Sequence, residues 1–153
     1  MIAMNDRMRT VLRATDLAGG RLPEGMQEIV RQGFLDVDGG VFLRGLLAFN
    51  GSAALVDFPD LTGYECFINS IHVDDHAADA YLALACRYAQ AVLDAWRARG
   101  AGPVARVIVS GDEEGAVVKF HVVRSGESWL AGDLEGYEEA VLWADSNEAW
   151  VFT

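Results

Sequence analysis

The stretch VARVIVSGDEEGAVVKFHVVR, residues 104–124, predicts two β-strands joined by a hairpin. Residues 104–110 and 116–124 are dense in β-branched side chains, and the glycines and acidic residues between them are typical of a turn. Just before the first strand, Gly100 ends a segment, residues 75–99, in which apolar residues recur at helical spacing. The region therefore predicts a long helix followed by an antiparallel β unit.

The predicted helix 75–99 carries charges that complement its dipole. Asp74, Asp75 and Asp79 lie at the expected N-terminus, where carboxylates are favourable, and arginines lie near the expected C-terminus. The apolar stripe that should face the core comprises Tyr81, Leu84, Tyr88, Val92 and either Ala95 or Trp96.

The remaining segments complete an α+β domain. One helix is expected from Asn5 or Asp6 to about Leu17, and a second over residues 23–32, because Gly33 follows it. The other expected strands and β segments are 34–37, 53–58, 64–73, 129–130, 140–144 and 150–152, while residues 41–49 fit either a strand or a helix. We predict a single domain, residues 1–153, with an antiparallel sheet of about four to six strands, one long helix across it and two shorter N-terminal helices.

The charge balance excludes one broad class of function. The 153 residues include 12 Lys and Arg against 23 Asp and Glu, a net charge of −11, which repels phosphate backbones and excludes direct nucleic-acid binding. No apolar run approaches the roughly 20 residues of a membrane span, and residues 1–13 lack the apolar core of a signal peptide. We therefore expect a cytoplasmic protein that does not contact membranes.

The negative charge is concentrated near the C-terminus. Residues 112–153 hold ten acidic residues against Lys119 and Arg124, a net charge of −8. Any net charge supports solubility, but this asymmetry also favours a surface that attracts a basic partner.

Motifs of common enzymes are absent from the sequence. There is no GxxxxGK[ST], GxGxxG, GxSxG or HExxH pattern, and Cys66 and Cys86 fit neither CxxC nor a zinc pattern. One cluster, His72-Val73-Asp74-Asp75-His76, has the composition of a metal site and leaves open a small metal-dependent hydrolase. The same residues also suit helix capping and hydrogen bonding at the end of a sheet, so we expect no enzyme, no cofactor and no metal.

Carboxylates interleaved with aromatic residues form the candidate binding site. Carboxylates can pair with the Arg and Lys side chains that a nuclease uses to hold phosphates, and aromatic residues serve as anchors in protein interfaces. The candidate carboxylates are Glu127, Asp133, Glu135, Glu138 and Glu139, with Trp129 and Tyr137 as anchors and, as second choice, Asp112, Glu113 and Glu114 on the hairpin tip.

Two stretches carry a resemblance to a known class of proteins. Residues 58–75, FPDLTGYECFINSIHVDD, and residues 129–146, with Asp-Leu-Glu-Gly-Tyr at 133–137, resemble the small acidic immunity proteins of bacterial polymorphic toxin systems, including contact-dependent growth inhibition. The resemblance implies an antitoxin without catalysis that binds one cognate toxin domain tightly, often a basic nuclease. A type III secretion chaperone, which would be dimeric, is the alternative within the binding class; an immunity protein is more in keeping with a monomer.

Overall fold

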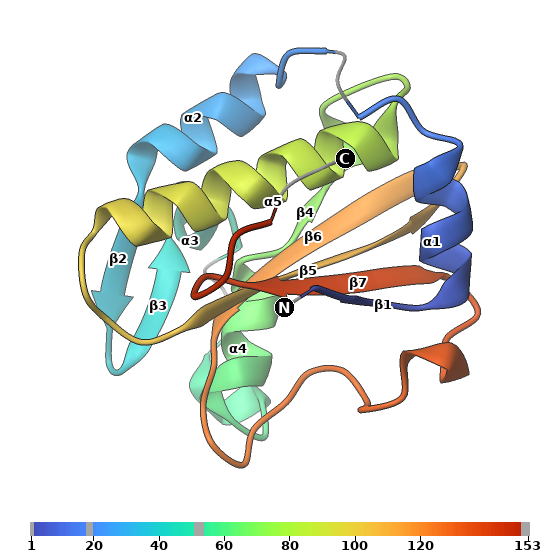
Figure 1. Cartoon of the computed structure of the whole chain (residues 1–153). Helices are drawn as coiled ribbons and strands as arrows, with labels where there is room; N and C mark the ends of the chain where they lie inside the picture. Colours follow the sequence, from blue (N-terminus) through green and yellow to red (C-terminus); the bar gives the residue numbers. More distant parts are fainter. Residues whose placement is uncertain (1, 18–19, 51–53, 151–153) are drawn as a thin grey trace.

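The computed structural model describes residues 2–17, 20–50 and 54–150, and it has the α+β class that the sequence predicts (Figure 1). A five-stranded antiparallel sheet has the order β1-β7-β5-β6-β4, and β2 and β3 form a separate hairpin. The strands are β1 (Ile2–Met4), β2 (Phe34–Val37), β3 (Gly40–Leu43), β4 (Ile71–His72), β5 (Ala105–Asp112), β6 (Gly115–Val122) and β7 (Ala140–Asp145). The helices are α1 (Asp6–Arg13), α2 (Glu24–Gln32), α3 (Arg44–Asn50), α4 (Leu61–Ile68) and α5 (Tyr81–Ala98), with 3₁₀ turns η1 (Leu55–Asp57), η2 (Val73–Asp75) and η3 (Leu134–Gly136).

The β5–β6 hairpin is the centre of the sheet, as expected from its sequence. Val107 pairs with Phe120 and Val109 with Val118, and these four side chains are buried against α5. The core side of α5 comprises the predicted residues Leu84, Tyr88, Val92 and Trp96, with Tyr81 half-buried beside them. Figure 1 shows α5 across one side of the sheet, and α4 and the chain between β6 and β7 on the other side.

The largest correction concerns residues 64–73, which we expected to form a strand. Residues 61–68 form α4 instead, and only Ile71 and His72 pair with β6. Asp60 begins the helix, because its side chain accepts a hydrogen bond from the backbone N–H of Gly63 at 2.8 Å. Tertiary contacts override β propensity here: Thr62, Glu65, Cys66 and Asn69 are among the buried residues of this segment and lie at helical spacing.

The long helix begins later than its charges suggested. It starts at Tyr81, and Ala80 before it has a left-handed conformation with φ of +55°. Asp74 and Asp75 form η2, so they do not cap α5, and Asp79 also lies outside the helix. At the other end the prediction is confirmed, since α5 ends at Ala98 and Gly100 follows with φ of +98°.

Smaller differences affect the short elements. Residues 41–49, which fitted either a strand or a helix, contain both: the end of β3 and then most of α3. Residues 129–130 and Trp150 are not in strands, and residues 54–58 contain only η1; residues 53 and 151–152 of these expected segments lie outside the described residues. The first helix ends at Arg13 rather than Leu17, and β1 was not predicted.

Candidate protein interface

The chain between β6 and β7 carries the densest negative charge of the candidate site. We call residues 125–139 the acidic segment: it holds Glu127, Asp133, Glu135, Glu138 and Glu139, and no Lys or Arg. Figure 1 shows it running from the end of β6, past α4, to η3 beside α1. The contacts that hold its two ends, to α4 and to α1, set its conformation.

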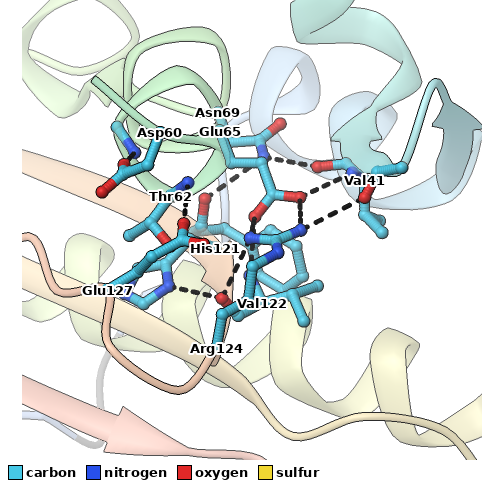
Figure 2. A network of polar contacts seen from close by, with 12 residues as sticks. Val41, Asp60, Thr62, Glu65, Asn69, His121, Val122, Arg124 and Glu127 are labelled. Carbon is cyan, nitrogen blue, oxygen red and sulfur yellow. Dashed lines mark hydrogen bonds and ion pairs between the residues drawn. The ribbon is translucent and has the colours of Figure 1, made fainter. Parts of the chain in front are cut away.

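A buried ion pair fixes the start of the acidic segment. The Glu65 side chain on α4 has 0 % exposure, and its carboxylate accepts hydrogen bonds from Arg124 Nη1 and Nη2, each at 2.7 Å (Figure 2). It also accepts from the backbone N–H groups of Val41 at 2.6 Å and Val122 at 2.9 Å. Four donors thus compensate the buried charge of Glu65, and this hydrogen bonding raises the pKa of Arg124.

A neighbouring amide completes the same network. The Asn69 side chain accepts from the Leu43 N–H at 2.8 Å and donates to the carbonyls of Val41 and Phe120 (Figure 2). Glu65 and Asn69 therefore join β3 to β6 through side chains, because no direct ladder connects the two strands.

Glu127 lies at the N-terminus of α4. Its carboxylate accepts a hydrogen bond from the Thr62 N–H at 3.1 Å, which lowers the pKa of Glu127 (Figure 2). Since free N–H groups at a helix N-terminus favour negative charge, this contact ties the acidic segment to α4.

The far end of the acidic segment is fixed at α1. Both carboxylate oxygens of Glu135 lie 3.1 Å from the Asp6 N–H, at the first turn of α1, and one lies 3.8 Å from Arg9 Nη1. Asp133 accepts from the Glu135 N–H at 3.0 Å and begins η3, while the Tyr137 hydroxyl accepts from the Ala131 N–H at 2.9 Å. Three of the predicted contact residues thus hold the segment in place.

The remaining predicted residues of the segment face solvent. Glu138 and Glu139 are exposed, and in the described part of the chain neither carboxylate makes a hydrogen bond. Trp129 keeps 45 % of its surface exposed, with Lys119 Nζ 5.5 Å from its ring centroid. Lys119 also donates to Ser70 Oγ at 3.1 Å, and burial lowers the pKa of Lys119. Trp129 is thereby placed close to the end of α4.

The structure separates the hairpin tip from the acidic segment. Asp112 accepts from the Glu114 N–H at 2.8 Å in the β5–β6 turn, and Glu113 and Glu114 are exposed. Asp112 and Glu113 line an open hollow between the end of α1 and the start of α5, and its lining comes from outside residues 125–139. The second-choice residues thus belong to another part of the surface.

Four large apolar side chains on α3, η1 and α4 are exposed, which was not predicted from the sequence. Phe49 is 87 % and Val56 88 % exposed, and Leu55 and Phe67 are about half exposed. These residues lie on α3, η1 and α4, and the sequence has no Lys or Arg between Arg44 and Arg87. A long segment without positive charge could have indicated, from the sequence, that this part of the surface is distinct.

His72, His121, Cys66 and Cys86 lie on four different elements, β4, β6, α4 and α5. Among the residues that the structure describes, no three His, Cys, Asp or Glu side chains are placed to hold a metal ion, so the His72–His76 cluster lacks the geometry of a metal centre. His121 is buried, its Nδ1 lies 2.8 Å from the Val122 carbonyl, and burial lowers the pKa of His121. Cys66 and Cys86 are buried free thiols, and burial raises the pKa of each to about 12.

Comparison with known proteins gives a family match. The model of the Uncharacterized protein PM0498 family matches residues 3–153. No curated protein and no solved structure matches the chain. Within residues 2–17, 20–50 and 54–150, no helix has the length and apolar character needed to cross a membrane.

Proposed function

This chain belongs to the Uncharacterized protein PM0498 family, and we propose that it is an immunity protein that binds and neutralises a cognate bacterial toxin domain, a basic nuclease. The acidic segment is the proposed contact surface, with Glu138 and Glu139 as charged contacts and Trp129 as an anchor. In this proposal the protein acts by binding and not by catalysis.

The fixed conformation of the acidic segment is the observation that carries the proposal. Glu65–Arg124 holds one end and Glu135 the other, so the backbone that carries Glu138 and Glu139, which follow Glu135 and precede β7, is already positioned before a partner arrives. Preorganised groups lose little conformational entropy on binding, which favours affinity. An acidic surface of this kind also increases the association rate with a basic partner.

The test uses two variants that change charge equally at different places. Glu138→Lys with Glu139→Lys alters the acidic segment, whereas Glu113→Lys with Glu114→Lys alters the hairpin tip; each changes the net charge by +4, from −11 to −7. These four side chains are exposed, and none accepts a hydrogen bond in the described part of the chain, so folding should be preserved. Asp133 and Glu135 are avoided, because reversing them would also remove the contacts that hold η3 and α1.

Each reading frame that flanks the gene is expressed alone and together with this protein in a bacterial host. We expect one to be toxic and to be neutralised by the wild type and by the hairpin-tip variant. The Glu138/Glu139 variant should bind the toxin domain about tenfold more slowly in low salt, with a smaller difference in high salt. Absence of any neutralised toxic neighbour contradicts the immunity function, and equal rates for both variants contradict the acidic segment as its contact surface.

The two alternatives are tested on the same protein. A type III secretion chaperone should elute as a dimer in gel filtration, whereas we expect a monomer. A hydrolase that uses the His72–His76 cluster should lose activity in His72→Ala with His76→Ala, whereas we expect that variant to neutralise the toxin as the wild type does.

A further inference from the structure

A hollow of about 290 Å³ lies between α3 and the β4–η2 segment, and its lining comes from residues outside the acidic segment. Its walls are largely apolar and come from Ile29, Leu46 and Ile71. Asp75, His72 and His76 line it as well, and of these Asp75 and His72 are exposed. The hollow thus combines apolar walls with a carboxylate and two imidazoles at its edge.

The ring of Phe49 belongs to the lining of the hollow although it is 87 % exposed. Asp75 lines the same hollow as Phe49. A hollow that has both an aromatic ring and a carboxylate in its lining suits a guanidinium group, which stacks on aromatic rings and pairs with carboxylates through its planar fork of N–H donors.

We propose that this hollow receives an arginine side chain of the protein partner, an inference that rests on the proposed function. The three methylenes of the arginine lie against Ile29, Leu46 and Ile71, and the guanidinium lies between Phe49 and Asp75. Long cationic side chains regularly bury their methylenes on apolar surface in this way and keep the charge near water.

The charges around the hollow favour a cation over an anion. Among the described residues that line it, Asp75 is the one formally charged residue, and residues 45–86 contain six acidic residues and no Lys or Arg. Arg44, the first residue of α3, is exposed, and its Nη2 donates to the Phe34 carbonyl at 3.4 Å. Lys119 lies on the neighbouring strand β6, where its Nζ donates to Ser70 Oγ and faces Trp129. Because Ser70 also lines the hollow, the arginine site adjoins the part of the proposed contact surface that holds Trp129.

The test needs no identified partner, because n-butylguanidinium reproduces the arginine side chain. The ¹⁵N-labelled protein is titrated with n-butylguanidinium chloride and, separately, with neutral n-butylurea, and amide shifts are followed by NMR. We expect saturable shifts for residues that line the hollow with a Kd on the order of 10 mM, and much weaker binding of the urea. Asp75→Asn and Phe49→Ala should each weaken guanidinium binding at least about fivefold.

Asp79→Asn is the matched control, since Asp79 is also exposed but lines the other hollow, beside α5. Binding that is unchanged by Asp75→Asn, or shifts that are equal for the urea, would overturn the arginine site. If the guanidinium fails to bind while the Glu138/Glu139 variant loses protection, the arginine site is wrong and the immunity function stands. If the guanidinium binds as expected but no toxic neighbour is neutralised, the immunity function is wrong and the hollow remains a cation site.

Discussion

Replacing Arg124 by Met should destabilise the protein strongly, because it leaves the Glu65 carboxylate buried with only two backbone donors. Arg124→Met removes two hydrogen bonds of 2.7 Å from a carboxylate whose side chain has 0 % exposure. Removing one partner of a buried ion pair costs about 3–5 kcal/mol. The Arg124 side chain itself is 18 % exposed, so water can partly replace it, and we expect about 3 kcal/mol, the lower end of that range.

The assay is equilibrium unfolding in urea followed by far-UV circular dichroism. At an unchanged m-value, the free energy of unfolding should fall by about 3 kcal/mol, which for a chain of this length lowers the Tm by about 6–12 °C. Arg124→Lys should lose less, because an ammonium keeps the charge but cannot bind both carboxylate oxygens in the fork geometry of arginine. Amide hydrogen exchange of residues 125–127 should also become faster in Arg124→Met, since the start of the acidic segment loses its attachment.

Arg31→Met is the control, because Arg31 makes an ion pair with Glu28 in which both side chains are largely exposed, at 58 % and 45 %. It should change the free energy of unfolding by at most about 1 kcal/mol. The reasoning is refuted if Arg124→Met loses no more free energy of unfolding than Arg31→Met. If Arg124→Met does not fold, an Arg124→Lys variant as stable as the wild type refutes it equally.

Three further outcomes follow from burial and capping. Leu84→Ala on α5 should lower the free energy of unfolding by about 2–5 kcal/mol, measured in urea, because Leu84 is only 8 % exposed; an unchanged midpoint would contradict its place in the core. Glu135→Ala should cost about 0.5–2 kcal/mol and increase hydrogen exchange at the Asp6 amide, which Glu135 caps, whereas exchange at Thr62 should stay as it is. Since burial raises the pKa of Cys66 and Cys86 to about 12, a thiol reagent at pH 8 should label them only in denaturant, and rapid labelling of the native protein would contradict this. The free energy of unfolding should also fall as the pH rises from about 9 towards 12, because the thiols lose their protons at lower pH in the unfolded chain than in the folded protein.

Local sequence patterns were sufficient for the elements that follow one clear periodicity. The β5–β6 hairpin and the core side of α5 are where their spacing predicts, because alternation or helical recurrence extends over many residues there. Residues 64–73 lack such a pattern: their aromatic and β-branched content favours a strand, but Glu65 and Asn69 must reach β3 and β6 together. A helix brings residues four apart to within about 6 Å of each other, whereas a strand would separate them by about 13 Å. That requirement involves residues more than 20 positions away, so no local pattern contains it.

The candidate site was predictable in its residues but not in their roles. Charge density identified the acidic segment, but the sequence does not distinguish the roles of Asp133 and Glu135 from that of Glu138. Only the fold shows that Asp133 begins η3 and that Glu135 binds the first turn of α1. The hollow beside Phe49 could not be predicted, because its lining comes from α2, α3, β4 and η2 and depends on how these elements pack.

The side-chain bridge from Glu65 and Asn69 has a consequence for self-association. β4 pairs with only two residues of β6, which would leave the backbone groups of Phe120 and Val122 as an open strand edge. Asn69 and Glu65 occupy those groups, so the edge cannot template pairing with another chain. The same helix that holds the start of the acidic segment thus also protects this edge of the sheet from pairing with another chain, and changes that loosen α4 should expose the edge before the molecule unfolds.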